Sequence, residues 1–274
     1  MTNYLQKVLL PQYSHVNKVY CLLAATVFCA LPLCSTEAAA ENILKYDGTT
    51  NIHGNAKTWA AKNEYDGIDI RVTGVDGGYY TDTTEALVLN NQTLNVKGKG
   101  KFVSIINSAQ NKQIDNNGGI YAKGGSTVNF TDVDSIYIAA IAGKEGGNDS
   151  TVISAKDPVR DLKGYTNIVN ISGTTVQLIG SIDVMHSLGS VFFNRNARHT
   201  VNAALSGSDS FWYGSAIGET DERTTVNLSL ADGATWIFNA GKSTLNAGGI
   251  IRNLKLDKGV VLFADAEVWE TYRK

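Results

Sequence analysis

The chain has 274 residues, a formal net charge of −2 and 18% charged residues. This near balance of acidic and basic side chains excludes the strongly basic surface that nucleic-acid binding requires. The three cysteines, Cys21, Cys29 and Cys34, all lie within the first 40 residues. The rest of the chain therefore has no residue for a disulfide, a thiol nucleophile or a cysteine metal site.

The first 40 residues are typical of a secretion signal. Lys7 and Lys18 lie in a polar n-region, and an apolar run follows at residues 19–34. This run is shorter than the ~20 residues that a transmembrane helix needs. We therefore expect a signal peptide with an extended n-region.

Small residues follow the apolar run, and they fit the cleavage positions of a signal peptidase. Ala38 and Ala40 occupy these positions directly before Glu41. We expect cleavage after Ala40, so that residues 1–40 are removed and residues 41–274 form the exported domain.

Beyond the signal, the apolar stretches alternate with period two, which predicts β-strands. Short turns rich in Gly, Asn, Asp or Ser separate these stretches. The sequence therefore predicts an all-β domain with some twenty strands of four to six residues. In chain order, the clearest strands are expected at 68–72, 87–89, 94–96, 128–130, 136–138, 168–171, 176–179, 191–193, 226–230 and 236–238.

One pattern recurs in these strands: an apolar residue, an asparagine, and a second small or apolar residue. The six asparagines of this pattern are Asn95, Asn129, Asn170, Asn202, Asn227 and Asn246. Their spacings of 34, 41, 32, 25 and 19 residues are too irregular for propeller blades. They suit a solenoid with coils of about 20–25 residues and loops of varying length.

A parallel β-helix would place Val226 and Leu228 in a stacked core and Asn227 on the outer face. If copies of the pattern occupy adjacent coils, the asparagine side chains should stack as a ladder. An antiparallel sandwich is the alternative, because glycine-rich turns also connect antiparallel strands.

Residues 225–263 contain a longer pattern: a strand, Asp-Gly-Ala, Trp, a short strand, Gly-x-Ser, Leu-x-Leu, and Gly before another strand. The positions are Asp232, Gly233, Ala234, Trp236, Gly241, Ser243, Leu254, Leu256 and Gly259. This segment resembles the passenger repeats of bacterial autotransporters. The resemblance implies a single right-handed parallel β-helix, exported through the periplasm to the cell surface or the medium of a diderm bacterium.

Autotransporters also carry a C-terminal membrane barrel of long amphipathic strands. This sequence contains no such strands. We expect the barrel to be encoded in a longer gene or as a separate product, or the chain to be a free exoprotein.

A dense aromatic run, Phe211, Trp212 and Tyr213, is a candidate contact surface. Neighbouring residues on a strand face opposite sides, so burial of Trp212 would expose its two neighbours. Exposed aromatic rings can stack on sugars or anchor a protein partner. A strand covered on both sides explains the run as well.

Clustered carboxylates could act as the acid and base of a carbohydrate-cleaving β-helix enzyme. The candidate clusters are Asp66 with Asp69, Asp132 with Asp134, and Glu219 with Asp221 and Glu222. Asp132 and Asp134 share a strand parity, whereas Asp66 and Asp69 do not. Solvated turns and edges account for all three clusters without catalysis.

Other candidate sites have weaker signals. The order of residues in Gly207-Ser208-Asp209-Ser210 differs from the GDSGS serine motif of protease passengers, so we expect a turn there. The histidines His53, His186 and His199 are scattered, although Asp183 lies near His186 in sequence. Residues 74–78 are glycine-rich, but they lack the full repeat of calcium β-rolls.

The sequence therefore predicts a non-enzymatic adhesin that binds a host-cell or glycan surface, without a cofactor and without nucleic acid. An extracellular carbohydrate-active enzyme is the second hypothesis. A truncated fragment without independent function is the third.

Overall fold

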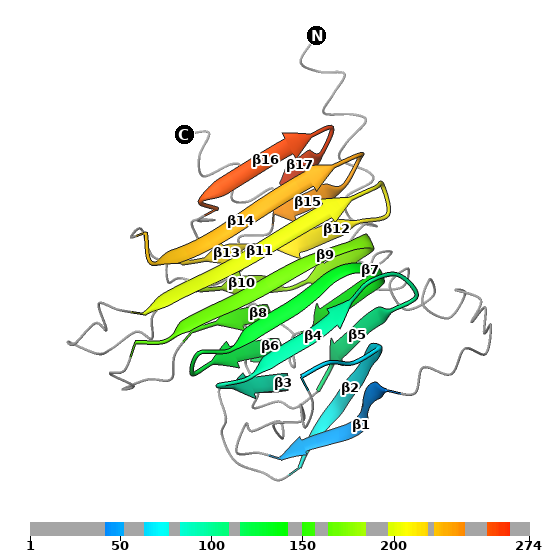
Figure 1. Cartoon of the computed structure of the whole chain (residues 1–274), viewed down its shortest axis with the longest axis vertical. Helices are drawn as coiled ribbons and strands as arrows, with labels where there is room; N and C mark the ends of the chain where they lie inside the picture. Colours follow the sequence, from blue (N-terminus) through cyan, green and yellow to red (C-terminus); the bar gives the residue numbers. More distant parts are fainter. Residues whose placement is uncertain are drawn as a thin grey trace. The chain divides into compact units, whose positions relative to one another are not determined.

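The computed structural model describes residues 42–51, 63–76, 83–109, 116–141, 150–156, 164–184, 197–218, 222–238 and 251–263. These residues form seventeen β-strands and no helix (Figure 1), which confirms the all-β fold class. Within these ranges no helix could cross a membrane. The expected signal peptide and its cleavage positions, Ala38 and Ala40, lie outside the described residues.

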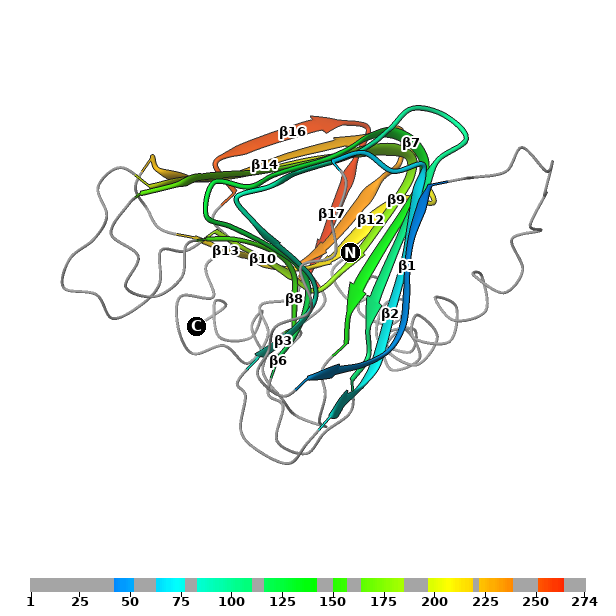
Figure 2. The same cartoon turned by 60° about the horizontal axis from the view of Figure 1, so that its bottom comes forward.

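Every pair of described strands is parallel, and the strands lie in three rows (Figure 2). The antiparallel alternative is therefore wrong for these strands. The first row contains β4 (Thr93–Lys97), the N-terminal parts of β7 (Thr127–Ala140) and β9 (Thr166–Ile179), β11 (Arg198–Ser206), β14 (Thr224–Ala231) and β16 (Asn253–Asp257).

The second row contains β1 (Ile43–Asn51), β2 (Gly67–Asp76), β5 (Phe102–Asn107), the C-terminal parts of β7 and β9, β12 (Phe211–Gly214), β15 (Thr235–Phe238) and β17 (Val260–Phe263). The third row contains β3 (Thr83–Asn90), β6 (Asn116–Lys123), β8 (Thr151–Ala155), β10 (Ser181–Asp183) and β13 (Ala216–Ile217).

From β4 to β15, the chain visits the rows in a repeating order: first, second, third and first again. Each such circuit lies beside the previous one, because each strand pairs with its counterpart one circuit earlier. The expectation of strands of only four to six residues was wrong. β7 and β9 each run for 14 residues, because they continue through the corner between the first and second rows.

Alternation along each strand separates core from surface. In β14, Val226, Leu228 and Leu230 are at most 2% exposed, whereas Asn227 and Ser229 lie on the outer side. The inward residues of the three rows meet in one hydrophobic core. Burying each such side chain contributes about 1.5–3 kcal/mol. The expected placement of Val226, Leu228 and Asn227 is therefore confirmed.

Candidate functional site

A ladder of asparagine side chains runs along the outer side of the first row. Parallel pairing aligns these residues, so each one lies beside its counterpart in the next circuit. Each Nδ2 donates a hydrogen bond of 2.6–2.8 Å to the Oδ1 of the preceding member. The asparagine ladder consists of Asn95, Asn129, Asn170, Asn202, Asn227 and Asn253.

The last member of the ladder differs from the sequence expectation. Asn246 lies outside the described residues, and Asn253 pairs with Asn227 instead. Sequence reasoning missed Asn253 because Arg252, which is polar, precedes it. The residues after Asn253 could have identified it, because the leucines at 254 and 256 repeat the alternation of those at 228 and 230 after Asn227.

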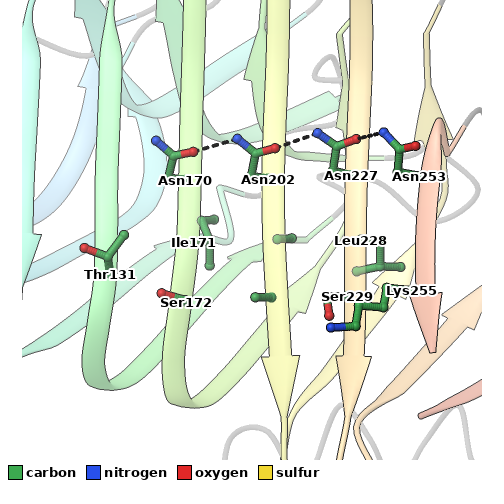
Figure 3. Close-up of a pocket in the computed structure, with 12 residues that line it drawn as sticks. Thr131, Asn170, Ile171, Ser172, Asn202, Asn227, Leu228, Ser229, Asn253 and Lys255 are labelled. Carbon is green, nitrogen blue, oxygen red and sulfur yellow. Dashed lines mark hydrogen bonds between the residues drawn. The ribbon is translucent and has the colours of Figure 1, made fainter. Parts of the chain in front are cut away.

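The ladder fixes the amides but leaves part of their hydrogen-bonding capacity unused. A primary amide has two N–H donors and an oxygen with two lone pairs. Within the ladder, Asn202 and Asn227 each donate once and accept once (Figure 3). Asn170 likewise donates to Asn129 and accepts from Asn202. Each of these three rungs therefore keeps one N–H and one lone pair for a ligand or for water.

Two lines of outward side chains run beside the ladder, one on each side of it. The line on one side is mostly threonine and consists of Thr93, Thr127, Ile168, Thr200 and Thr225. On the other side, small side chains continue to Lys255. A shallow groove of about 320 Å³ lies over the ladder and the small side chains, and its outward lining residues are Thr131, Asn170, Ser172, Asn202, Ala204, Asn227, Ser229, Asn253 and Lys255.

The groove combines neutral hydrogen-bonding groups with apolar surface, because Ile171, Ala203 and Leu228 also line it and most of its accessible lining is apolar. Amides and hydroxyls line it, and Lys255 at one end is its charged group. Because the ladder already restricts the amide rotamers, a ligand would lose little extra side-chain entropy on binding. Such a surface suits a hydroxyl-rich, uncharged ligand that lies across several strands.

The aromatic run lies on β12, in the second row. Trp212 is fully buried and stacks on Trp236, with ring centroids 5.1 Å apart and planes at 7°. Phe211 and Tyr213 face the opposite side of the strand and are half-buried. The parity argument therefore holds, and Trp212 belongs to the core rather than to a contact surface.

The residues of the repeat pattern have mostly structural positions. Asp232 and Gly233 form a corner between the first and second rows, with φ of 52° and 90°. Trp236 donates its indole N–H to the carbonyl of Gly214 at 3.0 Å. A Cβ on Gly259 would lie 2.3 Å from Cβ of Leu230, so only glycine fits there.

Leu254 and Leu256 lie on β16, whereas Gly241 and Ser243 are outside the described residues.

In the described structure, the candidate carboxylates lie at corners between strands, or they bind a backbone N–H or a lysine. Asp134 accepts a hydrogen bond from the backbone N–H of Gly100 at 3.0 Å. Asp132 has a φ of 57° and lies where the register of β7 shifts. Asp66 forms an ion pair of 3.1 Å with Lys101. Glu222 lies in a turn, whereas Glu219 and Asp221 are outside the described residues.

Ser210 is buried and structural. Its hydroxyl donates to the carbonyl of Ser206 at 2.6 Å and accepts from the backbone N–H of Val176 at 3.0 Å. The bond to Ser206 lies within the corner, and the bond from Val176 connects the corner to the preceding circuit. The expectation of a turn at residues 207–210 is therefore confirmed.

Among the histidines, His199 is fully buried beside Asn167. His53, His186 and part of the glycine-rich stretch at 74–78 lie outside the described residues. Within the described ranges, no group of three or more His, Cys, Asp or Glu side chains could hold a metal ion.

Comparisons with known proteins add no relative. No family model matches the chain, and no curated protein and no solved structure matches it. The likeness to autotransporter passengers therefore stays a prediction from the sequence pattern.

Proposed function

We propose that residues 41–274 form a right-handed parallel β-helix that is displayed outside a diderm bacterium as an adhesin. The repeated order of rows and the parallel pairing support this architecture. Right-handed connections between parallel strands are the rule, at about 98% of cases. The secretion-type N-terminus supports export, and the passenger-like pattern supports display.

The observation that carries the proposal is the asparagine ladder with its groove. Six amides stand in register over six circuits, and a 320 Å³ groove follows the last four of them. This surface offers repeated, pre-oriented, neutral hydrogen-bonding groups. The ligand that fits it is a glycan on a host cell or a neighbouring cell, bound without turnover.

Filling the groove tests this function. Ala204 lies at its centre on β11, with a small outward side chain. We expect Ala204→Trp to weaken binding of the purified chain to host cells or neutral polysaccharides by about tenfold or more, because the indole would occupy the groove. Surface plasmon resonance on immobilised polysaccharide measures the change.

Thr93→Trp is the matched control, because Thr93 is exposed on the first row but does not line the groove. If the two variants bind equally well, the ligand does not contact the groove. Product release from a polysaccharide that stops in Asp132→Asn or Asp134→Asn would instead establish the enzyme hypothesis.

A further inference from the structure

The groove over the asparagine ladder is longer across the strands than along them. Along each of β9, β11 and β14 it is lined by three consecutive residues, which on β11 are Asn202, Ala203 and Ala204. Three residues of a strand span about 7 Å. Across the strands the groove passes the four rungs from Asn170 to Asn253, and a strand separation of about 4.8 Å makes this distance about 14 Å. A chain-like ligand therefore fits along the line of amides (Figure 3).

The rungs in the groove present the same hydrogen-bonding groups at a constant spacing. Each of the four donates to the asparagine of the preceding circuit, so all four amides have the same direction. The remaining N–H and lone pair of one rung therefore recur at the next rung, one strand further on. A ligand that uses these groups in succession must itself repeat at the spacing of the strands.

Apolar surface accompanies the amides. Ala204 lies two residues after Asn202 on the same outward side of β11, and its methyl group is exposed. Small-molecule sites typically combine a mostly apolar lining with a few placed polar groups. A pyranose ring matches this combination, because its C–H groups form apolar faces and its hydroxyls lie at its edges. The groove therefore has the chemistry to bind a row of sugar rings.

The spacing of the rungs distinguishes between polymers. An extended peptide repeats at about 3.3 Å per residue, so its groups lose register with rungs that are about 4.8 Å apart. In an extended β-1,4-linked glycan, the length of one sugar is close to the separation of neighbouring strands. Alternate sugars are turned over, but hydroxyls lie on both edges of each ring. An α-1,4-linked glycan winds into a helix, so its successive sugars turn away from the line of amides.

We propose that the groove binds four consecutive sugars of an extended, neutral, β-linked glycan, with one sugar at each rung from Asn170 to Asn253. The inference rests on the proposed glycan binding and defines the class of ligand. A hydroxyl of each sugar hydrogen-bonds to the amide of its rung, and C–H groups of the ring contact the apolar lining. The common direction of the amides gives the bound glycan one preferred orientation.

Affinity as a function of glycan length tests the inference. The purified full chain is titrated by calorimetry with β-1,4-linked glucose oligosaccharides of two to six sugars, and with α-1,4-linked oligosaccharides of the same lengths. We expect each added β-linked sugar up to the fourth to lower Kd about three- to tenfold, because one more rung is occupied. The fifth and sixth sugars should add little. The α-linked tetrasaccharide should bind about tenfold more weakly or worse than the β-linked one.

Asn170→Ala shortens the line of rungs from one end. We expect the gain from the third to the fourth sugar to disappear, because the fourth sugar has lost its amide. Kd for the disaccharide should stay within about twofold, since three rungs remain for it. Thr93→Ala is the control and should keep the whole length profile, because Thr93 is exposed on the first row but does not line the groove. An equal loss of affinity at every length in Asn170→Ala would overturn the binding of one sugar at each rung.

The other outcomes separate this inference from the proposed function. Glycan binding that does not depend on length, or equal binding of α- and β-linked tetrasaccharides, would overturn the inference and leave adhesion standing. The absence of binding to any glycan would overturn both. Binding to host cells that is lost after protease treatment of the cells, but not after glycosidase treatment, would assign the contact to a protein and would also overturn the inference.

Discussion

At the scale of single residues, the asparagine ladder couples neighbouring circuits through side chains as well as through the backbone. Asn202 is bonded on both sides, whereas Asn253 is bonded only to Asn227 within the described part of the chain. A net contribution of about 0.5–1.5 kcal/mol for each hydrogen bond makes the two positions unequal.

We therefore expect Asn202→Ala to lower the free energy of unfolding by about 1–3 kcal/mol, because two hydrogen bonds are lost. Asn253→Ala removes one bond and should cost about half as much. Urea denaturation followed by intrinsic fluorescence measures both values. An equal effect of the two substitutions would mean that the ladder contributes little to stability.

At the scale of elements, the tryptophans and glycines link each circuit to the one before it. Trp212 and Trp236 stack in the core and donate to the carbonyls of Gly180 and Gly214. A Cβ on Gly214 would lie 2.1 Å from the carbonyl oxygen of Gly180. The spacing between circuits at this point therefore depends on glycine.

Gly214→Ala should lower the free energy of unfolding by about 2–4 kcal/mol, because the backbone of one circuit must move away from the next. Gly207→Ala is the control: Gly207 has a φ of 85°, but its Cβ would meet nothing closer than 4.0 Å. That substitution should cost only the strain of the left-handed backbone, about 1–2 kcal/mol. Thermal denaturation compares the two, and equal losses would argue against the clash.

At the scale of the whole molecule, the sequence predicts two parts with different fates. Export should remove residues 1–40 and leave a chain that begins at Glu41. Mass spectrometry of the chain recovered from the periplasm or medium of a diderm host tests whether its mass is that of residues 41–274. Ala40→Trp should block cleavage, because the position before the cut requires a small side chain. An unprocessed chain that stays in the cytoplasm would refute the predicted export.

Much of the fold follows from the sequence because the side-chain period of a strand is two. That period alone places Val226 inward and Asn227 outward, and it places Trp212 opposite its neighbours. The absence of cysteine beyond residue 34 likewise excludes disulfide chemistry without any structure.

The tertiary structure decided which residues from distant circuits meet. Loops of unequal length separate the strands, so spacing in sequence does not give register. Only the paired strands show that Asn253 is the last rung, that the ladder borders a groove, and that Ser210 bonds to Val176. The exposure of Leu254 also could not be predicted from the sequence, because alternation predicts that a side chain faces inward but not whether another circuit covers it.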